Sequence, residues 1–99
     1  MIASILPLEL QQRLEAQEPI QLIDIRENYE FEEGHLPAEN IPMDELVANP
    51  NLIRRDVPVI VYCKTGKRGA AMVYMFKKMH SLDHIINLEG GYEAYTSLN

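Results

Sequence analysis

The residues of this chain that are best suited to chemistry lie in one short stretch. Cys63, the only cysteine among the 99 residues, follows an apolar, β-branched run at 57–62. Lys64, Lys67 and Arg68 come within the next five positions, with no acidic residue among them. Nearby cations favour the thiolate, which is the nucleophilic form of a cysteine. The stretch therefore predicts an activated cysteine that handles a small anionic substrate.

Gly66 and the residues after it indicate how this loop is shaped. The sequence predicts a helix over 68–80, so the loop joins a strand to a helix N-terminus. Free N–H groups at such a terminus, together with the helix dipole, favour an anion. Gly66 permits a backbone turn that directs successive N–H groups inward. A lone cysteine is ordinarily an inert core residue, but these neighbours favour the reactive interpretation.

The elements that must position the loop alternate between strands and helices. Strands are predicted over residues 2–6, 20–25, 57–62 and 85–88, and helices over 7–16, 27–33, 43–48, 68–80 and 92–98. Residues 35–42 are expected to form an extended loop, since a proline disfavours helix in the residue before it. The alternation predicts a single α/β domain over residues 1–99, with a mainly parallel sheet and helices on both faces. Ligands of such sheets bind beyond the carboxyl ends of the strands, where Cys63 lies.

The composition excludes several classes of protein. A formal net charge of −6 argues against nucleic acid or an anionic membrane as the main partner. One cysteine cannot form an internal disulfide, and no apolar run approaches the roughly 18 residues of a membrane span. The N-terminus lacks the pattern of a signal peptide, so we expect a cytoplasmic protein. We also expect the protein to be a monomer. His80 and His84 have no cysteine or carboxylate at ligand-like spacing, so we expect no metal or other cofactor.

Four motifs in the chain resemble those of the rhodanese family of sulfurtransferases. Residues 63–68 match the active-site loop C-x-x-G-x-R, and residues 24–37 match D-x-R-x-x-x-E-[FY]-x-x-G-H-[IL]-P. Residues 40–42 match the N-I-P that follows, and residues 87–91 match N-L-x-G-G. The motifs occur in the family's order and span nearly the whole chain. The resemblance implies a single rhodanese-like domain.

The function that this resemblance implies is sulfur transfer through Cys63. The cysteine would accept sulfane sulfur from a small anionic donor such as thiosulfate and become a persulfide. It would then pass the sulfur to cyanide, a thiol or a protein acceptor. Backbone N–H groups of residues 64–68 would cradle the outer sulfur of the persulfide. The substrate-binding set implied by the resemblance is Lys64, Thr65, Gly66, Lys67 and Arg68.

Individual side chains in these motifs have ordinary alternatives. Lys64 and Lys67 would attract the donor, whereas Arg68 would either face the substrate or anchor the loop. Asp24 and Arg26 could be a solvated strand end, but the matching pair in the family supports the active-site loop. The acidic residues after this pair, which are Glu30, Glu32 and Glu33, are expected to form a solvated face. The family pattern makes His35 a structural residue bonded to backbone.

Two other functions stay open. Similar domains occur fused to adenylyltransferases that activate sulfur-carrier proteins, so the chain could be a relay or binding module that serves a desulfurase or a carrier. Cysteine-dependent phosphatases of the same fold have one more residue between cysteine and arginine and cradle a larger phosphate. The four-residue spacing here therefore disfavours phosphatase or arsenate reductase chemistry. Gly69 and Tyr95 depart from the family, which commonly has serine and tryptophan at these positions.

Overall fold

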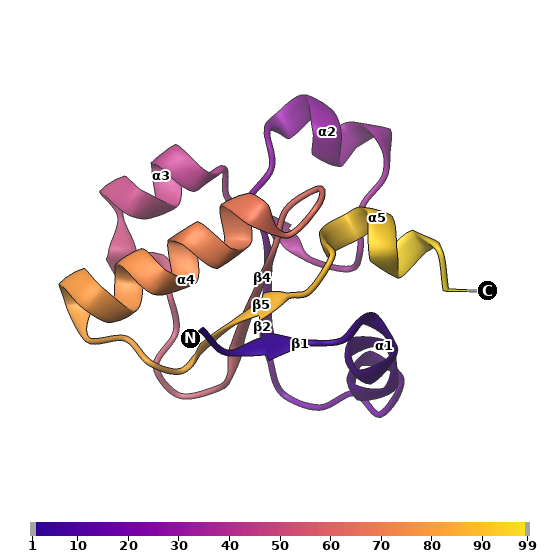
Figure 1. The fold of residues 1–99 in the computed structure, drawn as a ribbon, viewed down its shortest axis with the longest axis horizontal. Helices are drawn as coiled ribbons and strands as arrows, with labels where there is room; N and C mark the ends of the chain where they lie inside the picture. Colours follow the sequence, from indigo (N-terminus) through magenta and orange to yellow (C-terminus); the bar gives the residue numbers. More distant parts are fainter. Residues whose placement is uncertain (1, 99) are drawn as a thin grey trace.

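One sheet places the predicted cysteine loop at the carboxyl ends of its strands. The computed structural model describes residues 2–98. Its strands are β1 (Ser4–Ile5), β2 (Gln21–Asp24), β3 (Glu39–Asn40), β4 (Val59–Tyr62) and β5 (Ile85–Leu88). They form one sheet in the order β1-β5-β4-β2-β3 (Figure 1). Every pairing is parallel, so the predicted α/β fold with a mainly parallel sheet is confirmed.

Strand β4 occupies the centre of this sheet. It pairs with β2 through Leu22↔Ile60 and Asp24↔Tyr62, and with β5 through Val59↔Ile85. All four of its residues are fully buried. A strand covered on both faces needs apolar side chains on both sides, which is why its sequence is a continuous apolar run rather than an alternating one.

Helices cover both faces of the sheet. They are α1 (Pro7–Glu15), α2 (Asn28–Glu33), α3 (Met43–Ala48), α4 (Lys67–His80) and α5 (Gly91–Thr96), with a 3₁₀ turn at Pro50–Leu52. α3 and α4 lie on one side of the sheet and α1 and α5 on the other, while α2 lies above the ends of the strands (Figure 1). Ile23 and Val61 pack with Phe76 of α4, whereas Ile60 packs with Leu10 of α1. The period of two along each strand thus divides the core into two layers.

The structure differs from the sequence-based expectation in three places. β3 lies in the segment expected to be loop, because the backbone of Glu39 and Asn40 pairs with the edge of β2. The first strand covers two residues instead of five. α4 begins at Lys67, one residue earlier than predicted. No helix within residues 2–98 is both long and apolar enough to cross a bilayer.

Candidate active site

Cys63 lies at the point where β4 ends and the loop to α4 begins. Its side chain is buried, and the residue is 1% exposed. The Gly66 N–H donates to Cys63 Sγ at 3.1 Å, and the Gly69 N–H donates to the same sulfur at 3.4 Å. Gly66 has a φ of +98°, a left-handed conformation that glycine adopts without strain. The loop thus directs two backbone dipoles at one sulfur atom, as predicted for an anion cradle.

The second of these donors was not in the predicted set. The cradle was expected from residues 64–68, but Gly69, the third residue of α4, supplies one of the two N–H groups that reach Sγ in the described structure. The first N–H groups of a helix have no partner within the helix. Here the cysteine sulfur takes the place of a capping side chain. Two N–H groups aimed at one sulfur, at the start of a helix, form a site that is suited to an anion.

The carbonyl groups of the loop are held by the start of α5. The Tyr92 N–H donates to the Cys63 carbonyl at 2.8 Å, and the Glu93 N–H donates to the Lys64 carbonyl at 3.0 Å. Gly91, with a φ of +63°, allows this approach, since a Cβ there would lie 2.5 Å from the Cys63 oxygen. The loop carbonyls point outward to α5, so the N–H groups are free to point toward the sulfur.

Asn87 and Gly69 form a second contact beneath the loop. The sequence did not predict this contact. The Asn87 Nδ2 donates to the Gly66 carbonyl at 3.2 Å, and Asn87 is 5% exposed. A Cβ at Gly69 would overlap Asn87 Oδ1 and lie 3.1 Å from its Cγ. Asn87 Oδ1 has no hydrogen-bond partner among the described residues. Two features of the sequence could have indicated this contact. Asn87 is a polar residue inside an apolar strand, and Gly69 stands where the family commonly has serine.

Asp24 and Arg26 form a buried ion pair at the end of β2. Arg26 Nη2 lies 2.7 Å from Asp24 Oδ2, and the same nitrogen donates to the Gly34 carbonyl at 2.7 Å. The guanidinium also lies 4.3 Å from the ring centroid of Tyr92, whose N–H holds Cys63. Burial alone would lower the pKa of Arg26, but the hydrogen bond and charge of Asp24 raise it. The pair thus reaches the loop through Tyr92, which is compatible with its predicted supporting role.

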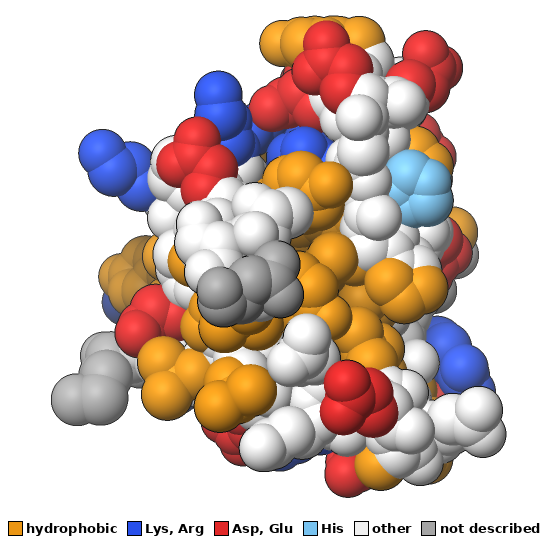
Figure 2. Space-filling model, turned by 90° about the vertical axis from the view of Figure 1, so that its right-hand side faces the viewer, with side chains coloured by type: hydrophobic (Ala, Val, Ile, Leu, Met, Phe, Trp, Pro, Cys, Tyr) orange, Lys and Arg blue, Asp and Glu red, His pale blue; other side chains and the backbone are white. Residues whose placement is uncertain are grey.

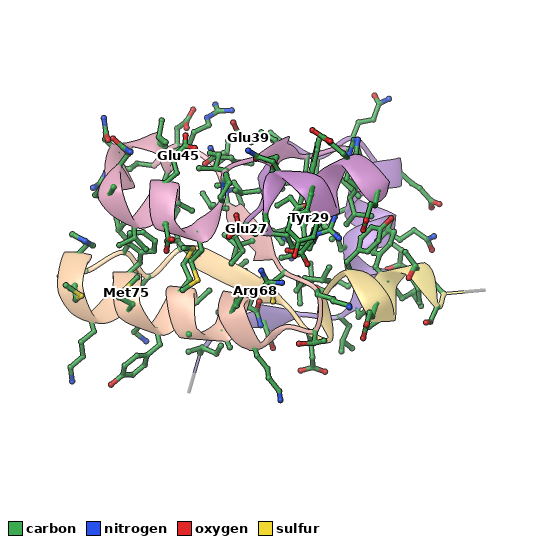
Figure 3. The ribbon with its side chains drawn as sticks, turned by 90° about the horizontal axis from the view of Figure 1, so that it is seen from above. Glu27, Tyr29, Glu39, Glu45, Arg68 and Met75 are labelled. Atoms are coloured by element: carbon green, nitrogen blue, oxygen red, sulfur yellow. The ribbon has the colours of Figure 1, made fainter. Side chains whose placement is uncertain are left out.

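Arg68 and Glu30 form an ion pair that spans 38 residues of sequence. Arg68 Nη1 and Nη2 each lie 3.3 Å from one carboxylate oxygen of Glu30. The Glu30 side chain is 14% exposed, so the expectation that it belongs to a solvated face is wrong. Burial would raise the pKa of Glu30, but the hydrogen bond from Arg68 lowers it. In Figure 3, Arg68 lies between the start of α4 and α2.

The other predicted side chains lie at the surface of the loop. Lys64, Thr65 and Lys67 are exposed, and Lys67 begins α4 instead of lying in the loop. Lys64 Nζ lies 3.9 Å from a carboxylate oxygen of Glu93, whereas Lys67 has no ion pair with any residue from 2 to 98. His35 Nδ1 lies 2.6 Å from the Leu36 carbonyl, which is a contact with backbone.

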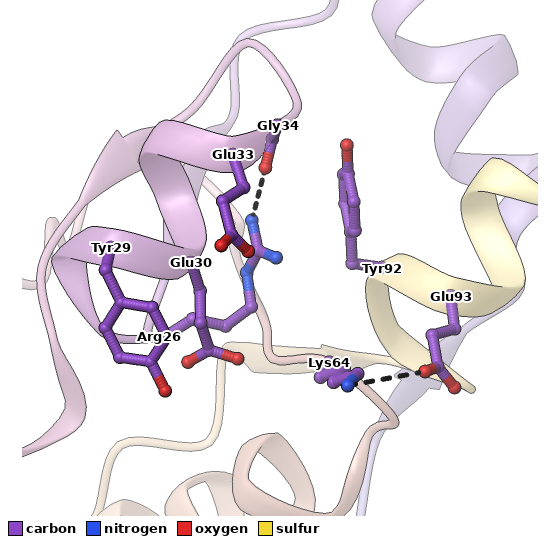
Figure 4. A pocket seen from close by; sticks show the side chains of 8 residues that line it. All are labelled: Arg26, Tyr29, Glu30, Glu33, Gly34, Lys64, Tyr92 and Glu93. Carbon is purple, nitrogen blue, oxygen red and sulfur yellow. Dashed lines mark hydrogen bonds and ion pairs between the residues drawn. The ribbon is translucent and has the colours of Figure 1, made fainter.

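A cavity of about 280 Å³ opens beside the loop. Its lining residues come from the end of β2, from α2, from the loop and from α5 (Figure 4): Arg26, Tyr29, Glu30, Glu33, Gly34, Lys64, Tyr92 and Glu93. Cys63 itself is not among them. Over the part of the chain that the structure describes, no cluster of three or more histidine, cysteine or acidic side chains could hold a metal ion.

Comparison with known proteins gives a consistent result. The family described as "Rhodanese-like domain" matches residues 6–98. A protein of Allochromatium vinosum named "Sulfurtransferase" is 33% identical over 88 residues, which span 87% of this chain and 80% of that protein. The uncharacterized protein YqhL of Bacillus subtilis is 42% identical over 76 residues, which span 76% of this chain but only 60% of YqhL. The crystal structure of a rhodanese-like domain protein from Staphylococcus aureus has a TM-score of 0.85 and 32% identity, and the match covers 95% of this chain and 91% of that one.

Proposed function

The chain belongs to the rhodanese-like domain family, and from this premise we propose that it is a sulfurtransferase whose Cys63 carries the sulfur as a persulfide. Sulfane sulfur comes from thiosulfate or a similar donor and passes to cyanide, a thiol or a protein acceptor. The observation that carries the proposal is the convergence of the Gly66 and Gly69 N–H groups on Cys63 Sγ, at 3.1 and 3.4 Å. A cradle of this kind stabilises the thiolate that attacks and the same thiolate when it leaves.

The proposed reaction has two displacement steps at sulfur. The Cys63 thiolate attacks the outer sulfur of thiosulfate, the sulfur–sulfur bond breaks, and sulfite leaves with the electron pair. The acceptor then attacks the outer sulfur of the persulfide, and the electron pair of the broken bond returns to Sγ. The loop stays in place throughout, because its carbonyls are held by the Tyr92 and Glu93 N–H groups of α5.

Intact mass spectrometry tests this proposal. After incubation with thiosulfate and removal of the excess, we expect the protein to gain about 32 Da, the mass of one sulfur. Cyanide should then restore the original mass and yield thiocyanate. Cys63→Ser should show neither signal, and Lys78→Met, on an exposed side chain at the far end of α4, is a control that keeps the cysteine and the loop. A protein that gains no sulfur from thiosulfate or from a small persulfide would refute the proposal.

A relay module is the second candidate, and one observation favours it. The lining of the cavity beside the loop has three carboxylates, from Glu30, Glu33 and Glu93, and two cations, from Arg26 and Lys64. This excess of negative charge opposes the approach of a free dianion. In that case the protein exchanges sulfur with a partner such as a desulfurase or a carrier, and thiosulfate is a poor substrate. Comparing the loading rate from thiosulfate with that from a persulfide donor at equal concentration separates the two candidates.

A further inference from the structure

Glu30 holds Arg68, the cation of the loop that was expected either to face the substrate or to anchor the loop. Its two carboxylate oxygens each lie 3.3 Å from a nitrogen of Arg68. Glu30 Oε1 also accepts the Glu27 N–H at 3.0 Å at the start of α2, which fixes the carboxylate in place. An anion that binds Arg68 must therefore displace a carboxylate that belongs to the protein.

The other cations around the cavity are also paired with carboxylates. Lys64 lies 3.9 Å from Glu93, and the charge of Arg26 is met by Asp24. Glu33 adds a further carboxylate to the lining (Figure 4). Figure 2 shows acidic side chains gathered at the top of the molecule, where Figure 1 places α2. The approach to the loop on this side is thus acidic, although the loop sequence itself is basic.

We propose that Glu30 determines the charge of the sulfur partner, because it competes with an anionic substrate for the guanidinium of Arg68. The partner favoured by this pair is a thiol or persulfide that is neutral or cationic near its sulfur, and Glu30 slows loading from a small dianion such as thiosulfate. The inference rests on the proposed function and specifies its substrate class. One unit charge a few ångströms away in a partly solvated site changes a rate by about threefold to tenfold.

The step in which this preference is measured is the unloading of the persulfide. The thiolate of the acceptor, whose proton has gone to solvent, attacks the outer sulfur on Cys63. The sulfur–sulfur bond breaks and its electron pair remains on Sγ, so Cys63 leaves as a thiolate and the acceptor becomes a persulfide. No outside oxidant or reductant is needed.

The test compares three small acceptors that differ in the charge away from the sulfur: cysteamine carries an ammonium, 2-mercaptoethanol a neutral hydroxyl and 3-mercaptopropionate a carboxylate. Their attacking thiolates therefore have net charges of zero, −1 and −2. The full-length chain is loaded with sulfur and its unloading rate is measured with each thiol. Each rate for Glu30→Gln is divided by the wild-type rate, so the intrinsic reactivity of the thiol cancels. Glu30→Asp keeps the charge, and Glu32→Gln removes an acid of α2 that does not line the cavity. Circular dichroism verifies that each variant is folded.

The expected result is a dependence on charge that follows Glu30. Glu30→Gln should speed unloading to 3-mercaptopropionate, and loading from thiosulfate, by about threefold to tenfold. The gain should be smaller for 2-mercaptoethanol and smallest for cysteamine, and added salt should shrink the differences. Glu33→Gln, on an exposed residue of the same cavity, should act in the same direction, so the test does not depend on one variant.

Two results would overturn the inference while leaving the proposed function intact. Equal rate ratios for all three thiols in Glu30→Gln would mean that Glu30 only supports the loop. An equal shift in Glu32→Gln would mean that overall surface charge, not the pair with Arg68, sets the preference. A wild-type protein that gains no sulfur from any donor would instead overturn the proposed function, and mass spectrometry distinguishes that failure from the other two.

Discussion

Replacing Gly69 by alanine sets two effects of opposite sign against each other. Alanine is favoured over glycine in a helix by about 1 kcal/mol, and Gly69 lies in the first turn of α4. The new Cβ would overlap Asn87 Oδ1 and lie 3.1 Å from its Cγ. Overpacking of a buried site costs about 1–3 kcal/mol, and the displaced amide loses its hydrogen bond to Gly66, worth about 1 kcal/mol. The overlap outweighs the helix preference, so we expect Gly69→Ala to destabilise the protein by about 1–3 kcal/mol.

The double variant Gly69→Ala/Asn87→Ala separates the two effects. Asn87→Ala alone should cost about 1 kcal/mol or less, because the Gly66 carbonyl still accepts the Ala70 N–H at 3.0 Å. With the amide gone, the Cβ at position 69 has room and the helix preference is realised. The double variant should therefore be more stable than Gly69→Ala, with a coupling of about 2–4 kcal/mol.

Urea unfolding followed by far-UV circular dichroism measures these free energies, since the chain has no tryptophan. Each kcal/mol corresponds to about 4–8 °C in Tm for a domain of this size. The rate of Cys63 alkylation by iodoacetamide at neutral pH provides a second readout. Gly69→Ala should lower it, because relief of the overlap moves the start of α4 and with it the N–H at position 69, which donates to Sγ. A Gly69→Ala variant that is more stable than wild type, or a double variant whose cost is the sum of the single costs, would refute this reasoning.

Three further predictions concern the framework of the site. Asp24→Ala should destabilise the protein by about 3–5 kcal/mol in urea unfolding, because it leaves the buried guanidinium of Arg26 without its partner; a cost below 1 kcal/mol would contradict this. Tyr62→Phe should cost about 1–3 kcal/mol, since the Tyr62 hydroxyl accepts the Leu36 N–H at 3.1 Å. Burial raises the pKa of Tyr62 above its value in the unfolded chain. The stability that follows from this shift is therefore present below the pKa of the unfolded chain and is lost as pH rises above it. Unfolding measured from pH 8 to pH 12 should show this loss, and Tyr62→Phe should reduce it. Gly91→Ala should abolish folding or sulfur loading, because its φ of +63° and a Cβ 2.5 Å from a loop carbonyl leave no room for a side chain; normal loading would show that α5 does not hold the loop.

The parts of the site that the sequence predicted correctly depend on local pattern. The apolar run that ends at Cys63, the glycine at position 66 and the helix that follows are features of consecutive residues, and the structure has them in that order. The parallel sheet followed from the alternation of strands and helices. The family motifs also contain the segments that meet the loop, because Glu30 of residues 24–37 contacts Arg68 and Asn87 of residues 87–91 contacts Gly66.

The parts that could not be predicted depend on contacts between distant residues. A short edge strand such as β3 is made by backbone pairing and has no side-chain pattern of its own. The pairing of Arg68 with Glu30 connects residues 38 positions apart, and nothing in the acidic run distinguishes Glu30 from Glu32. The loop is therefore less basic than its own sequence indicates, because the carboxylates that pair with its cations lie elsewhere in the chain.

The most direct test of the central claim uses donors whose outer sulfur carries a heavy isotope. A gain of about 32 Da could also come from oxidation of the cysteine to the sulfinic acid, whereas transfer of heavy sulfur adds about 34 Da. With labelled thiosulfate or a labelled small persulfide, we predict this heavier gain on the peptide that contains Cys63. Cyanide should then remove it as labelled thiocyanate, in about one equivalent per chain. A gain without the label, a gain on another residue, or no gain from either donor would contradict the assignment of Cys63 as the carrier of sulfur.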